Sequence, residues 1–85
     1  MAYQIELAST ARKQLDKLPK PTQKRIATAI DNLKETPRPP GTKKLKGADD
    51  LWRVRAGSYR VIYQIQDEQL LVLVVKIGHR KKVYK

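Results

Sequence analysis

The feature that most constrains the fold is a run of apolar residues, LLVLVV, at positions 70–75. A strand with one face in water alternates apolar and polar side chains, whereas this run is apolar on both faces. Its β-branched composition favours a strand, which we place at residues 69–77. Such a strand is expected to lie inside a sheet, with helices covering one side of that sheet.

Two further strands are predicted immediately before this apolar strand, at residues 51–56 and 59–66, because both segments are rich in β-branched and aromatic side chains. A Gly-Ser pair at 57–58 and an Asp-Glu pair at 67–68 provide tight connections between consecutive strands. The second half of the chain is therefore expected to form an antiparallel meander.

Two amphipathic helices are predicted in the first half of the chain. The first has apolar residues at positions 11, 15 and 18, can be capped by Ser9 or Thr10, and ends at Pro19. The second has apolar residues at positions 26, 30 and 33, starts near Pro21, which suits a first helical turn, and ends before Pro37. We expect these helices to form a hairpin that packs on the sheet.

The remaining segments complete the expected topology. Residues 2–7 alternate apolar and polar side chains and should form a half-buried strand. Residues 36–44, TPRPPGTKK, should form a loop with a restricted backbone between the helices and the meander. The predicted fold is a single α+β domain over residues 1–85, with the element order β-α-α-β-β-β.

Charge indicates the class of partner. Nineteen Lys and Arg against eight Asp and Glu give a formal net charge of +11 and a pI of about 10.2, which indicates a polyanionic partner, nucleic acid first and an acidic protein second. The alternative is a Lys-rich surface that only aids solubility. Without cysteine, and with His79 as the one histidine, no disulfide, thiolate or multi-histidine metal site is expected. No signal peptide or membrane span is predicted, so we expect a cytoplasmic protein.

The strands around the Gly-Ser turn separate apolar from basic residues. A two-residue turn places one set of side chains on one face as core: Trp52, Val54, Val61 and Tyr63. The other face carries Arg53, Arg55 and Arg60, with Arg55 directly opposite Arg60. Like charges in this position are destabilising, so the pattern predicts an oxyanion site. The alternative is that the arginines extend into water or pair with Asp49, Asp50 or Asp67.

The C-terminal segment, GHRKKVYK, is expected to approach the arginines. If the Asp-Glu turn also has two residues, Arg60 faces Val75, and Ile77 and His79 follow on the arginine face. The segment would then add groups that can transfer a proton, bind phosphate or stack on a base, namely His79, Arg80, Lys81, Lys82 and Tyr84. The alternative is a solvated basic tail that binds RNA without specificity.

The segments KKLKG, LWRVRAGSYRVIYQI and VLVVKIGHRKKVY, in this order of elements, resemble the RelE-like branch of the RelE/ParE superfamily. The resemblance covers nearly the whole chain and implies the toxin of a type II toxin–antitoxin pair. RelE-type members are ribosome-dependent endoribonucleases, or mRNA interferases, which cut mRNA in the A site. The 2′-hydroxyl attacks the adjacent phosphate, and no metal or cofactor takes part.

The resemblance also implies roles for particular residues. The expected catalytic set is Arg53, Arg55, Arg60, His79, Arg80 and Tyr84, and the expected RNA-binding set is Lys43, Lys44, Lys46, Lys81 and Lys82. In the best-known member, lysines occupy the positions of Arg53 and Arg55, and one of them is proposed as the general base. Because a neutral guanidine is rare, an arginine is a poor general base. The general base would then be His79, which we prefer, or Tyr84.

Partners follow from the same resemblance. It implies a cognate antitoxin whose acidic segment covers the basic surface, and it implies the ribosome and mRNA as targets. An alternative within the superfamily is the ParE-like branch, whose members inhibit DNA gyrase by binding protein. A further alternative is an RNA-binding module without catalytic activity.

Overall fold

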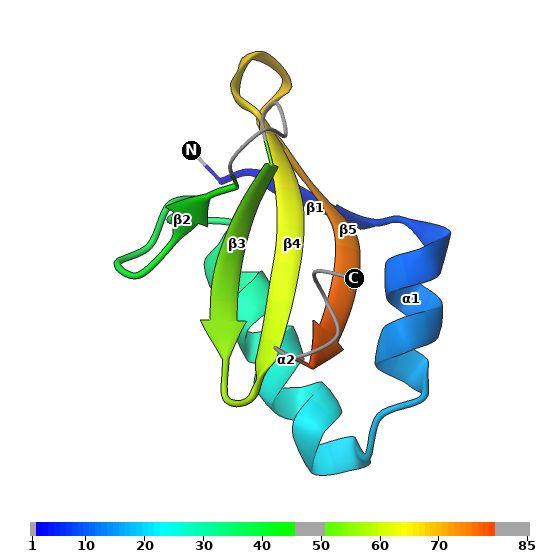
Figure 1. Ribbon diagram of the computed structural model, residues 1–85. Coiled ribbons are helices and arrows are strands. Elements are labelled where there is room, and N and C mark those ends of the chain that lie inside the picture. Colours follow the sequence, from blue (N-terminus) through cyan, green and yellow to red (C-terminus); the bar gives the residue numbers. More distant parts are fainter. Residues whose placement is uncertain (1, 46–50, 80–85) are drawn as a thin grey trace.

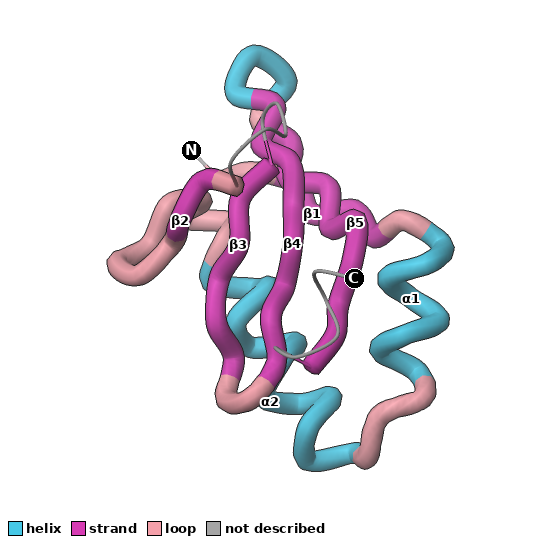
Figure 2. The backbone as a smooth tube through the Cα atoms, in the orientation of Figure 1, coloured by secondary structure: helices cyan, strands magenta, loops and turns pink. Residues whose placement is uncertain are grey.

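The computed structural model describes residues 2–45 and 51–79, and these form an α+β fold with one mixed sheet (Figures 1 and 2). The strands are β1 (Gln4–Leu7), β2 (Lys43–Lys44), β3 (Leu51–Ala56), β4 (Tyr59–Gln66) and β5 (Leu71–His79), in the spatial order β1-β5-β4-β3-β2. β1 pairs parallel with β5, and the other pairs are antiparallel. The helices are α1 (Ser9–Asp16) and α2 (Lys20–Asn32). The predicted fold class is confirmed.

The apolar strand β5 lies inside the sheet, between β1 and β4, as its composition predicts. Val72, Val74 and Ile77 are at most 1% exposed and form the centre of the core. α2 packs behind β3 and β4, and α1 packs along β5, so both helices cover the same face (Figure 1). Within residues 2–45 and 51–79, no helix lies on the opposite face of the sheet (Figure 1).

The start of α1 differs from the prediction. Ala8 is the N-cap residue, no side chain caps the helix, and Ser9 lies inside its first turn. The reason is tertiary: the amide of Ala8 donates to the carbonyl of Val74 (2.8 Å), so the chain stays bound to β5 until residue 8. Beyond the end of β1, Gln14 of α1 accepts a hydrogen bond from the Ile77 amide (2.7 Å) and so satisfies the exposed edge of β5.

The proline-rich loop is tied to the core by Tyr63. This side chain is fully buried, and its hydroxyl donates to the carbonyl of Pro37 (2.7 Å). Burial raises the pKa of the Tyr63 phenol above its ordinary value. The loop prediction is wrong at its end, where Lys43–Lys44 form β2 opposite Arg53 and Trp52. Sequence reasoning missed β2 because two lysines carry no strand signal, and only pairing with β3 makes them a strand.

The connection between β4 and β5 also differs from the predicted two-residue turn. Asp67–Gln69 form a short 3₁₀ helix, which ends at Leu70 in the left-handed conformation (φ 51°). A β-bulge follows, because Ile62 pairs with Lys76 while Tyr63 pairs with Val74, which leaves Val75 as the extra residue. The bulge determines which side chains at the end of β5 face the arginines.

Asp67 links three distant segments at one end of the sheet. Its carboxylate accepts hydrogen bonds from the Tyr3 hydroxyl (2.7 Å) and from Arg38 (2.9 Å to Oδ2). The guanidinium of Arg38 also lies over the ring of Trp52, 5.0 Å from its centroid. The hydrogen bonds from Arg38 and Tyr3 hold the pKa of Asp67 below its usual range.

We expect Asp67→Asn to lower stability at pH 7, and the deficit to disappear in acid. A carboxyl whose folded pKa is depressed stabilises the fold above its unfolded pKa, near 3.8 here, and this contribution is lost as pH falls through the folded pKa. Urea unfolding of both proteins at pH 7 and pH 3 measures the difference. Glu68→Gln is the control, because the described residues give Glu68 no ion pair. An equal deficit at both pH values would contradict this assignment.

Candidate nucleic-acid interface

The β3–β4 hairpin has the register that the sequence predicts. Val54 pairs with Val61, Arg55 with Arg60, and Ala56 with Tyr59. Gly57 occupies the first turn position with φ 63°, a conformation that suits glycine and the type II′ turn. A two-residue turn with this geometry matches the twist of the strands, and it fixes the pairing of every residue behind it.

This register separates the hairpin into an apolar and a basic face. Val61 and Tyr63 are fully buried beneath the helices, and Trp52 and Val54 pack beside them. The opposite face holds a hollow of about 310 Å³, lined by Gly41, Lys43, Arg53, Arg55 and Arg60. We call this hollow the arginine pocket. The structure thus brings four of the predicted site residues together, on the face that the helices leave open.

Like charges lie opposite one another throughout the arginine pocket. Lys43 pairs with Arg53, and Arg55 pairs with Arg60. In the free protein, directly opposed like charges such as Arg55 and Arg60 are destabilising by a few tenths to about 1 kcal/mol. Asp67, one of the three predicted counter-ions, is bound by Arg38 instead. Asp49 and Asp50, the other two predicted counter-ions, lie outside the described residues.

Arg60 shows the strongest sign of a missing partner. Its Nε is buried, yet it has no hydrogen-bond acceptor. A buried donor on a charged group is costly unless it is satisfied, and such groups need a specific explanation. By contrast, the Nε of Arg55 donates to the carbonyl of Gly57 (3.1 Å). Guanidinium groups bind phosphate oxygens through paired hydrogen bonds, so an oxyanion fits the pocket chemically.

His79 lies away from the arginine pocket, and the predicted register for the end of β5 is wrong. Arg60 pairs with Gly78, not Val75, and His79 pairs with Tyr59. The two rings meet edge to face, with centroids 5.6 Å apart. Tyr59 packs against the core, so His79 shares the helix-covered side. Ile77 also lies on that side, in the core.

The bulge is the physical reason for this correction. The longer turn moves the register by two residues, which leaves each side chain on its predicted face. The extra residue at Val75 then moves it by one more, which exchanges the faces from there onward. Lys76 and Gly78 therefore lie on the arginine face of the sheet, where the prediction put Ile77 and His79. Sequence reasoning missed Lys76, because nothing in the composition of β5 signals the bulge.

The remaining predicted residues are partly placed. Lys44 lies on β2 with its ammonium 5.9 Å from the centroid of the Trp52 ring, so it points toward a different part of the surface from the arginine pocket. The rest of the set lies outside the described residues, namely Lys46, Arg80, Lys81, Lys82 and Tyr84. Within the described ranges, no three His, Cys, Asp or Glu side chains gather as a metal site would require.

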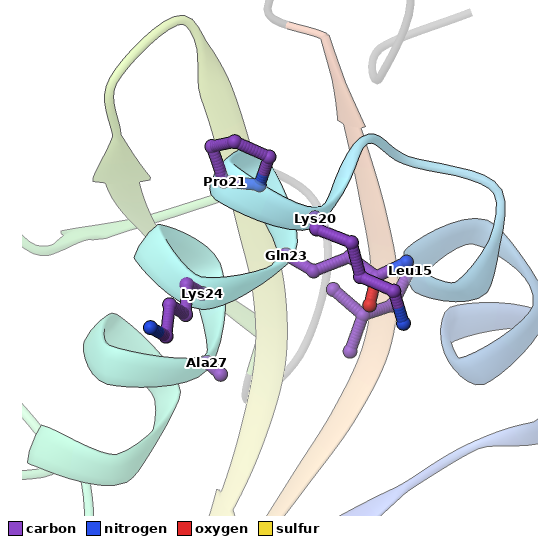
Figure 3. Close-up of a pocket in the computed structure, with 6 residues that line it drawn as sticks. All are labelled: Leu15, Lys20, Pro21, Gln23, Lys24 and Ala27. Atoms are coloured by element: carbon purple, nitrogen blue, oxygen red, sulfur yellow. The ribbon is translucent and has the colours of Figure 1, made fainter.

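Larger hollows lie on the other side of the molecule, around the helices. One of about 590 Å³ is lined by Leu15, Lys20, Pro21, Gln23, Lys24 and Ala27, from both helices (Figure 3). A second, of about 480 Å³, shares Leu15 and Ala27 with it and reaches β1. Apolar side chains dominate both linings, and the charged residues of the second hollow include Asp31 and Lys34, which pair with each other. Neither helix within the described ranges is long and apolar enough to cross a membrane.

Comparison with known proteins agrees with this architecture. The sequence model of the family described as ParE toxin of type II toxin-antitoxin system, parDE, matches residues 5–84. A putative RelE-like toxin protein of Escherichia coli is 34% identical, over 96% of this chain and 87% of the relative. The mRNA interferase toxin RelE of Escherichia coli strain K12 is 30% identical, with the same coverage.

A solved structure extends the comparison to three dimensions. The RelE–RelB complex of Pyrococcus horikoshii OT3 contains a chain with a TM-score of 0.83 and 31% identity to this one, covering 96% of this chain and 99% of that chain. The family match spans nearly the whole sequence, and the fold agrees with it. The chain therefore belongs to the RelE/ParE superfamily of toxins from type II toxin–antitoxin systems.

Proposed function

We propose that this toxin is a ribosome-dependent mRNA endoribonuclease that acts in the cytoplasm and stops translation. The observation that carries the proposal is the arginine pocket, where Arg60 has a buried and unpartnered Nε. A scissile phosphate would satisfy that donor and would neutralise the like-charged pair of Arg60 and Arg55. The relatives named as RelE toxins support the same activity.

The reaction requires a proton acceptor, a proton donor and charge stabilisation. The 2′-oxygen of the ribose attacks the adjacent phosphorus as its proton leaves, the bond from phosphorus to the 5′-oxygen breaks, and the leaving oxygen takes up a proton. Negative charge develops on the phosphate oxygens during this step. Fixed guanidinium groups at the pocket stabilise this charge without having to reorganise, and we assign that role to Arg53, Arg55 and Arg60. Arg80, outside the described residues, belongs to the same assignment by resemblance.

Two residues compete for the role of general base. His79 was the preferred candidate from the sequence, but its ring contacts Tyr59 on the side of the sheet opposite Arg60. It would have to leave that contact to reach a 2′-hydroxyl bound at the pocket. We therefore favour Tyr84, which the resemblance to RelE-type toxins assigns to the substrate; the basic residues beside it in the sequence would stabilise its phenolate. In the same scheme, Lys43 and Lys44, with Lys46, Lys81 and Lys82, bind RNA phosphates and raise affinity without choosing a sequence.

One observation favours the ParE-like alternative: the family model that matches this chain is described as ParE toxin. Inhibition of DNA gyrase would be a protein-binding function, and it would leave the pocket and the orphan Nε of Arg60 without a purpose. The two activities can be separated by direct assay.

The first prediction concerns cleavage in translating ribosomes. We expect the wild type to cut mRNA at the A site, and Arg60→Ala and Tyr84→Phe each to lower the cleavage rate by about 100-fold or more. His79→Gln should keep most of the activity. Primer extension maps the cuts, with Arg12→Ala on α1 as the control, and a gyrase supercoiling assay runs in parallel. Intact mRNA together with inhibited gyrase would assign the protein to the ParE-like class. If His79→Gln loses cleavage and Tyr84→Phe does not, His79 is the general base.

The second prediction concerns the antitoxin. A net charge of +11 should make an acidic toxin-binding segment associate rapidly, and the association rate should fall steeply as salt rises. Stopped-flow mixing of the toxin with its antitoxin at several salt concentrations measures this rate. An association rate independent of salt would contradict the electrostatic origin of neutralisation.

The third prediction is that one substitution in the arginine pocket raises the stability of the free protein and weakens its binding to RNA. Arg60→Gln removes both the like charge opposite Arg55 and a buried, unpartnered Nε, so we expect the free protein to gain a few tenths of a kcal/mol in unfolding free energy. The same change should weaken RNA binding, because one phosphate contact is lost. Urea unfolding and RNA binding by fluorescence anisotropy measure the two effects. Arg12→Gln is the control, and reduced stability together with unchanged RNA binding would contradict the assignment.

A further inference from the structure

We propose that Lys76 is a further mRNA-binding residue, which contacts the backbone phosphate next to the one held in the arginine pocket. The proposal rests on the proposed nuclease function. It begins from the register of the sheet, which places four side-chain positions in one row across β2, β3, β4 and β5. This row is Lys43, Arg53, Ile62 and Lys76.

The row belongs to the face that carries the pocket. Lys43 and Arg53 line the pocket, and Ile62 and Lys76 continue the same row beyond it. The bulge is what turns Lys76 to this side, because Ile77, its neighbour, is 1% exposed in the core beneath the helices. Without the bulge, the pairing would place Lys76 on the helix-covered face.

The side chain of Lys76 has a charge that can still bind a ligand. The residue is half-buried, and in the part of the chain that the structure describes it forms no hydrogen bond or ion pair through its side chain. The neighbouring row across the sheet ends in Arg60 and Gly78, so no side chain stands on β5 opposite Arg60. Among the described residues, those between Arg60 and Lys76 on this face are Gly78 and Ile62, which is 5% exposed.

Distance decides which group Lys76 can contact. Two strand spacings, about 10 Å in total, separate the backbone positions of Arg53 and Lys76. A single phosphate inside the pocket does not extend that far, whereas an RNA strand carries a negative charge on every nucleotide. The next phosphate along the strand is therefore the group that fits the ammonium. Lys76 and the pocket would together set the direction in which the mRNA crosses the sheet.

The test is single-turnover cleavage of mRNA in programmed ribosomes at increasing toxin concentration. We expect Lys76→Gln to raise the toxin concentration needed for half-maximal rate about three- to tenfold, with the maximal rate changed less than about twofold. Lys76→Arg should restore wild-type behaviour, because it keeps the charge. The control is Lys34→Gln, which removes an equal charge at the end of α2, where Lys34 pairs with Asp31.

A second readout uses binding to a short RNA oligonucleotide over a range of salt. Removing one phosphate contact should lower the slope of log affinity against log salt by about one in Lys76→Gln, and not in Lys34→Gln. If Lys76→Gln matches the control in both assays, Lys76 has no such role, although the nuclease assignment stands. A fall in the maximal rate alone would also overturn a binding role. If the wild type does not cut mRNA, the proposed function fails and this inference fails with it.

Discussion

The pairing of β3 with β4 is the interaction on which both the core and the candidate site depend. Gly57 can adopt the positive φ that a two-residue turn needs, and the turn determines the partner of every residue along the hairpin. The same pairing buries Val61 and Tyr63 beneath the helices and gathers the arginines on the other face. A shift by one residue would bury guanidinium groups and expose the core, so the hydrophobic effect holds the cationic cluster in place.

This arrangement explains how so small a protein can hold like charges together. The repulsion on the open face is opposed by contacts elsewhere: Tyr63 binds the proline-rich loop, Gln14 satisfies the edge of β5, and Asp67 joins Tyr3 to Arg38. None of these contacts touches the arginine pocket. The fold thus separates the groups that stabilise it from the like-charged groups of the pocket, as is common where function requires locally unfavourable chemistry.

The sequence was sufficient for the parts of the structure that depend on local pattern. The apolar period, the prolines and the Gly-Ser turn predicted both helices, the meander and the arginine face. The features that it missed depend on tertiary contacts: β2 exists only through pairing with β3, and α1 begins where Ala8 leaves β5. The bulge in β5 is of the same kind, and it moved His79 away from the pocket and brought Lys76 toward it. For Arg80 and Tyr84, resemblance remains the basis of the assignment.

The bulge has a consequence for how the superfamily diverges. Relative to a regular strand, the bulge in β5 exchanges the two sides of the sheet for the residues that follow it, through Gly78 and His79. A relative with the same number of residues that pairs this stretch without a bulge would present its histidine on the arginine side and turn the residue matching Lys76 toward the helices, without any substitution. Gain or loss of the bulge at this point therefore provides an evolutionary route between different sets of reactive side chains on an unchanged scaffold.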